Sequence, residues 1–305
     1  MKPSKRISEY RVVMTSFFVD LLDVFLNLVV ALFTGSVVML SEFFQGVADL
    51  TSAGFLVVGH KRAKKPADKL HPFGYGKEIY FWTLISAIVM MTLAATASFH
   101  AGFNRFLHPE KIDHIYLAYG ALLIALTTNS YALSLSIRRL MQGKPLRQLH
   151  RTFLNSSSVA TKNTFVLDLM GAMGAGSGLI SLLLYQLTGD LRFDAIGAML
   201  VGGTTAILAL VLIIGVEGFL VGKRASAEVE EHIKKAALTI PQVKQILDLR
   251  TMQIGSEKLL VNMEVHMEDE LTTDQLELLI DKIKAQVQTK VPSIQFVQVE
   301  LETPE

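Results

Sequence analysis

The chain has 305 residues, of which 50% are hydrophobic, and its mean hydropathy is +0.40. This composition is too apolar for an ordinary soluble protein of this length and predicts several membrane spans. The net charge of +1 gives no support for nucleic acid binding, and the lack of cysteine excludes disulfides and thiolate metal sites. We therefore expect the lipid bilayer, and no nucleic acid, as a partner.

Apolar runs long enough to cross about 30 Å of hydrocarbon recur along the first part of the chain. Short joints with turn residues separate them, such as Thr34-Gly35-Ser36 and Thr188-Gly189-Asp190. The runs predict an all-α transmembrane bundle of six helices within residues 1–222. They lie at 12–33, 37–59, 80–103, 115–137, 163–187 and 194–221.

The basic residues alternate between the two ends of these spans. Residues 2–11 contain four Lys and Arg, and residues 60–77 and 138–162 contain six each, against none, two and one in the alternate connections. The positive-inside rule therefore places both termini in the cytoplasm. The N-terminus has no short apolar core with a cleavage site, so we expect it to be a cytoplasmic lead-in. Without a transit peptide, a bacterial plasma (inner) membrane is the expected location of this multi-pass protein.

The pattern changes near Lys223, where long apolar runs give way to amphipathic segments. The order predicts a cytoplasmic α+β domain at residues 223–305, with an αββαβ arrangement and helices on one face of a three-stranded sheet. Thr272 is the expected cap of the second helix. The predicted elements are a helix at 226–239, two strands within 243–267 hinged near Gly255-Ser256, a helix at 272–289 and a strand at 294–301.

Polar groups on the second span point to an ion pathway. Glu42, Gln45 and Asp49 are three and four residues apart, which puts them on one helix face. A carboxylate at membrane depth costs a few kcal/mol and by default indicates an ion or proton path. The alternative is an aspartate that pairs with a basic group or takes part in helix packing.

The fifth span carries a similar set. Thr164 and Asp168 are four residues apart, with Asn163 beside them, and a face rich in glycine follows. Small residues at this density let helices approach closely, as a second span that supplies ligands to a shared site requires.

Three further aspartates lie in or beside the predicted spans. Asp20 and Asp23 share one face of the first span and serve either packing, the outer ligand shell or a proton path. Asp194 begins the sixth span, and we expect it to cap a helix or to pair with Arg192.

Several segments together resemble the cation diffusion facilitator family: TGSVVMLSEFFQGVADL, PADKLHPFGYGKE, FDAIGAMLVGG and LRTMQIGSEKLLVNMEVHMEDEL. The resemblance covers nearly the whole chain. It implies six spans, a ferredoxin-like cytoplasmic domain, a homodimer, and exchange of a divalent cation for protons. The family's transport site, carried over by position, falls on Gln45, Asp49, Thr164 and Asp168.

The chain departs from the family pattern at two of these positions, because Gln45 and Thr164 replace the usual histidine or carboxylate. An all-oxygen site suits harder or larger ions such as Mn²⁺, whereas Zn²⁺ prefers nitrogen and sulfur ligands. Zinc stays an alternative, since Glu42, Asp23, Asn163 or water could complete the shell. With no histidine in the core pairs, proton exchange would fall to the two aspartates.

The resemblance also implies a secondary metal site in the loop after the second span. Asp68 and His71 match two of its ligands, and Tyr75 replaces a third. The alternative is that this segment forms a structural turn.

The C-terminal domain retains His232 of the family's metal positions, and Glu300 and Glu302 lie in the same region with Asp248 and Glu264. Carboxylates bind late transition metals less tightly than imidazoles do. A low-affinity metal sensor, a domain that dimerises without metal, and solvated acidic strand ends are the three alternatives.

The sequence thus predicts a divalent metal efflux transporter of the Zn²⁺ or Mn²⁺/Fe²⁺ class. The expected ligand is the transported ion itself, and we expect no bound cofactor. The alternative is a non-transporting homologue that stabilises another transporter as a heterodimer, but such a protein would have no need for Asp49 and Asp168 in the membrane. No nucleotide loop or nucleophile motif occurs, so we do not expect an enzyme.

Overall fold

The computed structural model describes the backbone of residues 9–156 and 158–304, and the side chains within those ranges from residue 20 onward. Most of the basic stretch at residues 2–11 lies outside the described residues. The chain forms two compact units. One contains Met1–Val58, Trp82–Phe153 and Ala160–Gly215, and the other contains Gly59–Phe81, Leu154–Val159 and Val216–Glu305. The expected division between residues 222 and 223 stays a prediction.

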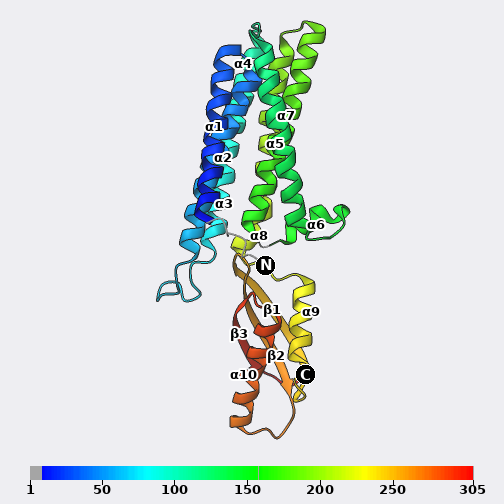
Figure 1. Cartoon of the computed structure of the whole chain (residues 1–305). Coiled ribbons are helices and arrows are strands. Elements are labelled where there is room, and N and C mark those ends of the chain that lie inside the picture. The colour runs from blue at the N-terminus through cyan, green and yellow to red at the C-terminus, as the bar shows by residue number, and fades with distance from the viewer. Residues whose placement is uncertain (1–8, 157, 305) are drawn as a thin grey trace, which may run out of the picture. The chain divides into compact units, whose positions relative to one another are not determined.

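Long helical segments lie at the six positions that the apolar runs predict (Figure 1). Within the described residues, four are long and apolar enough to cross a membrane: Glu78–Leu107, Ile115–Met141, Val159–Thr188 and Arg192–Val221. The other two are 26 and 27 residues long, and the second contains the polar positions that lower its hydropathy. The predicted helical membrane fold is confirmed. The elements are α1 (Glu9–Thr34), α2 (Val37–Ala63), α3 (Glu78–Val89), α4 (Thr96–Leu107), α5 (Ile115–Met141), α6 (Leu149–Asn155), α7 (Val159–Thr188) and α8 (Arg192–Val221), with a 3₁₀ turn at Leu146–Gln148.

The third span contains a feature that its sequence does not signal. Between α3 and α4 the helix widens into a π-helical segment, η1 (Met90–Ala95). The Thr96 hydroxyl donates to the carbonyl of Met91, five residues earlier, at 3.3 Å. No glycine or proline marks this place, so a regular helix was the expectation.

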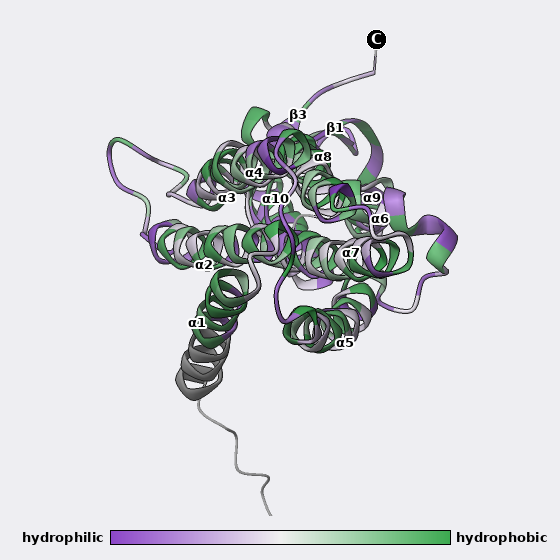
Figure 2. Ribbon diagram, turned by 90° about the horizontal axis from the view of Figure 1, so that it is seen from above, coloured by the Kyte–Doolittle hydropathy of each residue, from purple (hydrophilic) through white to green (hydrophobic). Residues whose placement is uncertain are grey.

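The outer surface of the bundle is apolar, as contact with lipid requires. Figure 2 shows the long helices mostly in the green of hydrophobic residues. Large exposed side chains include Leu22, Phe25 and Leu32 on α1 and Ile207 and Ile214 on α8.

Inside the bundle, glycines allow backbones to touch. A Cβ atom on Gly202 of α8 would lie 2.8 Å from the carbonyl oxygen of Ala95, and one on Gly102 of α4 would lie 2.8 Å from that of Ala195. Larger side chains at these positions would push the two helices apart.

Asp194 joins two helices at the joint between the first and second spans. Its carboxylate accepts hydrogen bonds from the Ser36 hydroxyl at 2.6 Å and from the backbone N–H groups of Val37 and Val38 at 2.7 and 3.2 Å. Asp194 therefore caps the N-terminus of α2, which confirms the expectation that it caps a helix. The other expectation, a pair with Arg192, was wrong: among the described residues no ion pair joins them, the Arg192 guanidinium lies over the ring of Phe106, and Arg105 is the cation that acts on Asp194.

The C-terminal part has the predicted αββαβ order. It comprises α9 (Ala227–Ala237), β1 (Val243–Gly255), β2 (Lys258–Met267), α10 (Thr273–Lys290) and β3 (Ile294–Leu301). The sheet order is β1-β2-β3, with β1 antiparallel and β3 parallel to β2. Thr272 caps α10 through a capping box with Gln275, which confirms its expected role.

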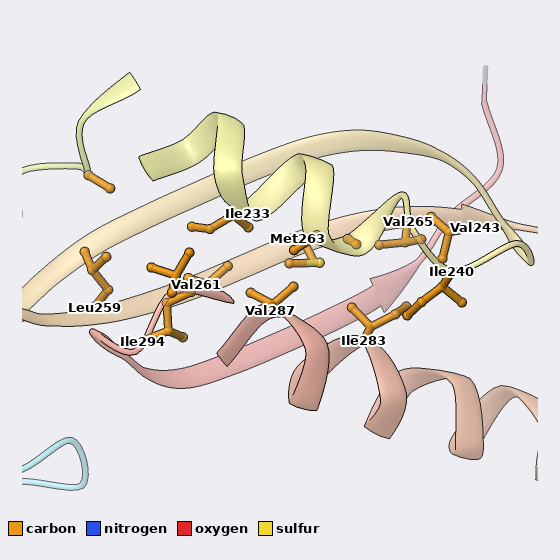
Figure 3. Packing of buried hydrophobic residues seen from close by; sticks show 14 of the residues in the cluster. Ile233, Ile240, Val243, Leu259, Val261, Met263, Val265, Ile283, Val287 and Ile294 are labelled. Carbon is orange, nitrogen blue, oxygen red and sulfur yellow. The ribbon is translucent and has the colours of Figure 1, made fainter. Parts of the chain in front are cut away.

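One hydrophobic core holds this α+β domain together. Alternate residues of β2, including Val261, Met263 and Val265, are fully buried and face Ile233 of α9 and Ile283 of α10 (Figure 3). Both helices thus cover one face of the sheet, which also holds the buried Thr251 and Gln253 of β1, and the opposite face carries the charged residues Asp248, Glu264 and Glu300. This is the ferredoxin-like arrangement that the resemblance implies.

We expect Asp194→Ala to destabilise the protein by about 1–3 kcal/mol, because two N–H groups and a hydroxyl lose a buried acceptor. Thermal unfolding in detergent measures the effect. The control is Asp190→Ala, in which an exposed aspartate that accepts from the Arg192 N–H at 2.9 Å is removed. Equal losses of stability in the two variants would contradict a special role for the buried cap.

Candidate functional site

The polar face of α2 is buried among the helices. Glu42 and Gln45 are 5% and 4% exposed. Asp49 is half-buried, and its Oδ1 atom is fully enclosed with no hydrogen-bond donor among the described residues. A buried carboxylate oxygen without a donor costs free energy, so this face is suited to a cation and poorly suited to simple packing.

Asp168 lies on α7, facing α5. It is half-buried and interacts with the Ser136 hydroxyl and the Arg139 guanidinium. It is also close enough to Asp49 for their charges to interact. Thr164, one turn earlier, donates its hydroxyl to the carbonyl of Ala160 at 2.9 Å, which leaves its oxygen lone pairs available to accept.

The first span adds two carboxylates to this group. Asp20 and Asp23 of α1 both lie within electrostatic range of Asp49. Both are exposed on the single chain, and Asp23 accepts a hydrogen bond from the buried Asn27 at 3.2 Å. Carboxylates from α1, α2 and α7 therefore surround Asp49.

Asn163 contributes to helix packing near the site. Its amide hydrogen-bonds with the Ser52 hydroxyl at 3.2 Å, and Ser86 donates to Ser52 at 2.6 Å. This network joins α7, α2 and α3. Ser52 follows Asp49 by three residues, so the spacing already placed the two on one helix face, a signal that the sequence reasoning missed. No pattern in the sequence indicated that Ser86 would join this network.

Gly174 is the third residue that the sequence reasoning did not single out, after Ser52 and Ser86. A Cβ atom there would lie 2.7 Å from Oε1 of Glu42 and 3.2 Å from Oε1 of Gln45. The bare backbone of α7 at Gly174 therefore makes room for two side chains of α2. The glycine-rich face of the fifth span predicted such an approach, although not its partner.

The chemistry of this group is that of oxygen ligands. Among the described residues, no three His, Cys, Asp or Glu side chains come together closely enough to hold a metal ion. A cation beside Asp49 would therefore be bound by few carboxylates, together with amide or hydroxyl oxygens and water. Such a shell suits a hard divalent ion that is taken up and released.

The loop after α2 is organised by Asp68. Its Oδ1 atom accepts from the backbone N–H groups of Leu70 and His71 at 2.9 and 2.7 Å, and its Oδ2 atom accepts from the Tyr75 hydroxyl at 2.7 Å. The Tyr75 hydroxyl, followed by the His71 N–H, holds the pKa of Asp68 below its usual value. The His71 Nδ1 atom is 3.5 Å from Asp68, so the two expected ligands do lie together, in a turn that already uses both carboxylate oxygens.

The expected ligands of the C-terminal domain are not brought together. His232 is exposed on α9, on the face of the sheet that the helices cover, and Glu302 is exposed just beyond β3. Glu300 pairs in register with Glu264, and Glu264 with Asp248, which forms a carboxylate row on the opposite face. The row has its own partners: Arg250 binds Asp248 at 2.7 Å and lies 3.9 Å from Glu264, and Glu300 accepts from Gln298 and Asn262.

Comparison with known families gives two matches. Residues 13–216 match the model of the cation efflux transmembrane domain, and residues 225–303 match that of the cation efflux protein, cytoplasmic domain.

Individual relatives are distant. The human proton-coupled zinc antiporter SLC30A9, mitochondrial, is 23% identical over 265 residues, which cover 86% of this chain and 47% of the relative. The magnetosome protein MamM of Magnetospirillum gryphiswaldense is 22% identical over 282 residues, or 90% of this chain and 82% of that protein. The chain spans about half the length of the first relatives. Among solved structures, a nickel form of a MamM CTD variant is 26% identical, covers 26% of this chain and all of its own, and has a TM-score of 0.25.

We expect Tyr75→Phe to raise the pKa of Asp68 toward its usual value, because the hydroxyl that stabilises the carboxylate is removed. Carbon-13 NMR titration of the aspartates measures it. Since the folded pKa is lowered, the stabilisation of the turn by Asp68 is complete above the unfolded pKa and is lost as the pH falls through the folded one. Tyr131→Phe, at an exposed tyrosine of α5, is the control. An unchanged Asp68 titration in Tyr75→Phe would contradict this account.

Proposed function

The chain belongs to the cation diffusion facilitator family, and from this premise we propose that it moves a divalent metal cation out of the cytoplasm in exchange for protons. The observation that carries the proposal is the set of carboxylates around Asp49 inside a helical membrane bundle. Carboxylates at membrane depth cost too much to be retained for packing alone.

Asp49 and Asp168 supply the charge of the proposed transport site. Gln45 adds an amide oxygen one turn from Asp49, and Thr164 adds a hydroxyl one turn from Asp168. Two spans each contribute a carboxylate and a neutral oxygen, so a bound cation joins α2 to α7. Relative movement of these helices would then change the site's access and its affinity together.

The ligand atoms of the proposed site influence which metal ion it selects. Amide, hydroxyl and carboxylate oxygens suit Mn²⁺, and the lack of nitrogen and sulfur ligands weakens the selection of Zn²⁺. Zinc nevertheless binds generic sites more tightly than manganese, and one relative is named a zinc antiporter. Both ions therefore stay within the proposal.

Proton exchange follows from the same carboxylates. Several carboxylates in a low-dielectric space cannot all remain ionised without a positive partner. A metal ion and protons therefore compete for them, and binding of one releases the other. This competition is the physical basis of the proposed antiport, in which gradients of ions supply the energy.

The remaining assignments rest on the sequence and the family match. We infer a homodimer with contacts through the C-terminal domain, supported by the match of residues 225–303 to the family's cytoplasmic domain. The distribution of Lys and Arg supports cytoplasmic termini, and a bacterial plasma membrane is the proposed location.

We expect reconstituted protein to transport metal in a manner that depends on a pH gradient, and Asp49→Asn to abolish it while the protein still folds. The amide keeps the volume of the side chain and removes the charge that balances the cation. The measurement is uptake of Zn²⁺, Mn²⁺, Fe²⁺, Co²⁺ and Cd²⁺ into proteoliposomes, each with and without an imposed gradient. Asp190→Asn, at an exposed aspartate, is the matched control. Uptake independent of the gradient would refute the exchange, and full activity in Asp49→Asn would remove Asp49 from the site.

We expect Gln45→His to raise the ratio of zinc to manganese flux by about tenfold, the effect of ~1.4 kcal/mol in relative binding. The imidazole supplies the nitrogen ligand that zinc prefers. Flux ratios of the wild type and the variant measure this, with Gln186→His on the exposed part of α7 as the control. The same ratio in all three proteins would place Gln45 outside the ligand shell.

A further inference from the structure

Glu42 is a buried carboxylate that the proposed transport site does not use. It is 5% exposed, and its Oε1 atom has no hydrogen-bond donor among the described residues. An ionised carboxylate in such a place requires a positive partner, and the described side chains place none at this oxygen.

Two side-chain oxygens of α2 meet at the backbone of α7 beside Glu42. Its Oε1 atom and that of Gln45 both point at the backbone of Gly174 on α7, at 2.7 and 3.2 Å from the position that a Cβ atom would take. Asp23 of α1 is within electrostatic range of Glu42 and adds negative charge. α1 and α2 thus supply charge and oxygens, and α7 approaches them closely because Gly174 has no side chain.

The oxygens of Glu42 and Gln45 at Gly174 are distinct from the proposed ion position beside Asp49. Glu42 and Asp49 are seven residues apart on α2, and at 1.5 Å per residue this is a distance of about 10 Å along the helix. The two residues are therefore two helical turns apart on α2. Gln45 lies between them and can serve either position.

We propose that Glu42 and Gln45, with Asp23 close by, form a second divalent-cation site two turns from Asp49, against the bare backbone of Gly174. Its ligand is a hard cation of the Mn²⁺ type, because the site offers only oxygens and such ions keep several waters in place of protein ligands. The inference rests on the proposed function in one respect, namely that the bound ion is the transported one. The site would give the cation two successive binding positions along α2.

The test is the number of Mn²⁺ ions bound per chain, measured by equilibrium dialysis and metal analysis on the full-length protein in lipid nanodiscs. We expect Glu42→Gln to bind one Mn²⁺ fewer than the wild type. Gly174→Ala should lose the same ion without any change of charge, because the new Cβ would lie 2.7 Å from Oε1 of Glu42 and 3.2 Å from Oε1 of Gln45 and so displace both oxygens. Gly176→Ala is the matched control on the same helix, since its Cβ would meet only Leu126 at an ordinary 3.8 Å.

The outcomes separate this inference from the proposed function. Wild-type Mn²⁺ counts in both Glu42→Gln and Gly174→Ala would overturn the second site, even if Asp49→Asn abolishes flux and so supports the transport site. Retained flux in Asp49→Asn would count against the proposed function, whereas loss of one Mn²⁺ in Glu42→Gln and Gly174→Ala would still establish the second site. If Glu42→Gln fails to fold, Gly174→Ala decides the question against Gly176→Ala.

Discussion

Carboxylates inside an apolar helical bundle are the constraint on which the structure depends. Within the described part of the chain, no donor reaches the enclosed oxygen of Asp49, and Asp20, Asp23, Glu42 and Asp168 all act on its charge. Hydrophobic packing cannot offset such repulsion unless a positive ion or protons are present. The mutual repulsion of these carboxylates is therefore also the basis of the bundle's proposed capacity to bind and release cations.

The bundle around these carboxylates is held by contacts of a different kind. Backbones approach at Gly102 and Gly202, and the network of Asn163, Ser52 and Ser86 joins three helices through short polar side chains. Asp194 fixes the beginning of α2 by binding its N-terminal N–H groups. The glycine contacts and the Asn163 network consist of neutral groups, and only the Asp194 cap includes a carboxylate. They can position α2 and α7 without competing for the cation.

The α+β domain is stabilised by a hydrophobic core, as soluble proteins are. Its strands alternate between a buried face covered by α9 and α10 and a polar face, and its core consists of aliphatic residues (Figure 3). The carboxylate row on the polar face has an arginine and amides as partners. This balance differs from that around Asp49, whose enclosed oxygen has no donor among the residues that the structure describes.

Periodicity and composition by themselves determined the six helical segments, the αββαβ order, the Thr272 cap and the polar face of α2, because these depend on residues near one another in the chain. The partners of each face were decided only by the tertiary structure. Sequence spacing placed Glu42 on a helix face but did not indicate that Gly174 lies opposite it. It left Asp194 with two candidate roles. It also grouped His232 with Glu300, although the two residues lie on opposite faces of the sheet. The π-helical segment η1 had no local signal either. For Glu42, Asp194 and His232 the deciding arrangement joins residues far apart in the chain, because a local pattern fixes which way a side chain faces without fixing what it meets.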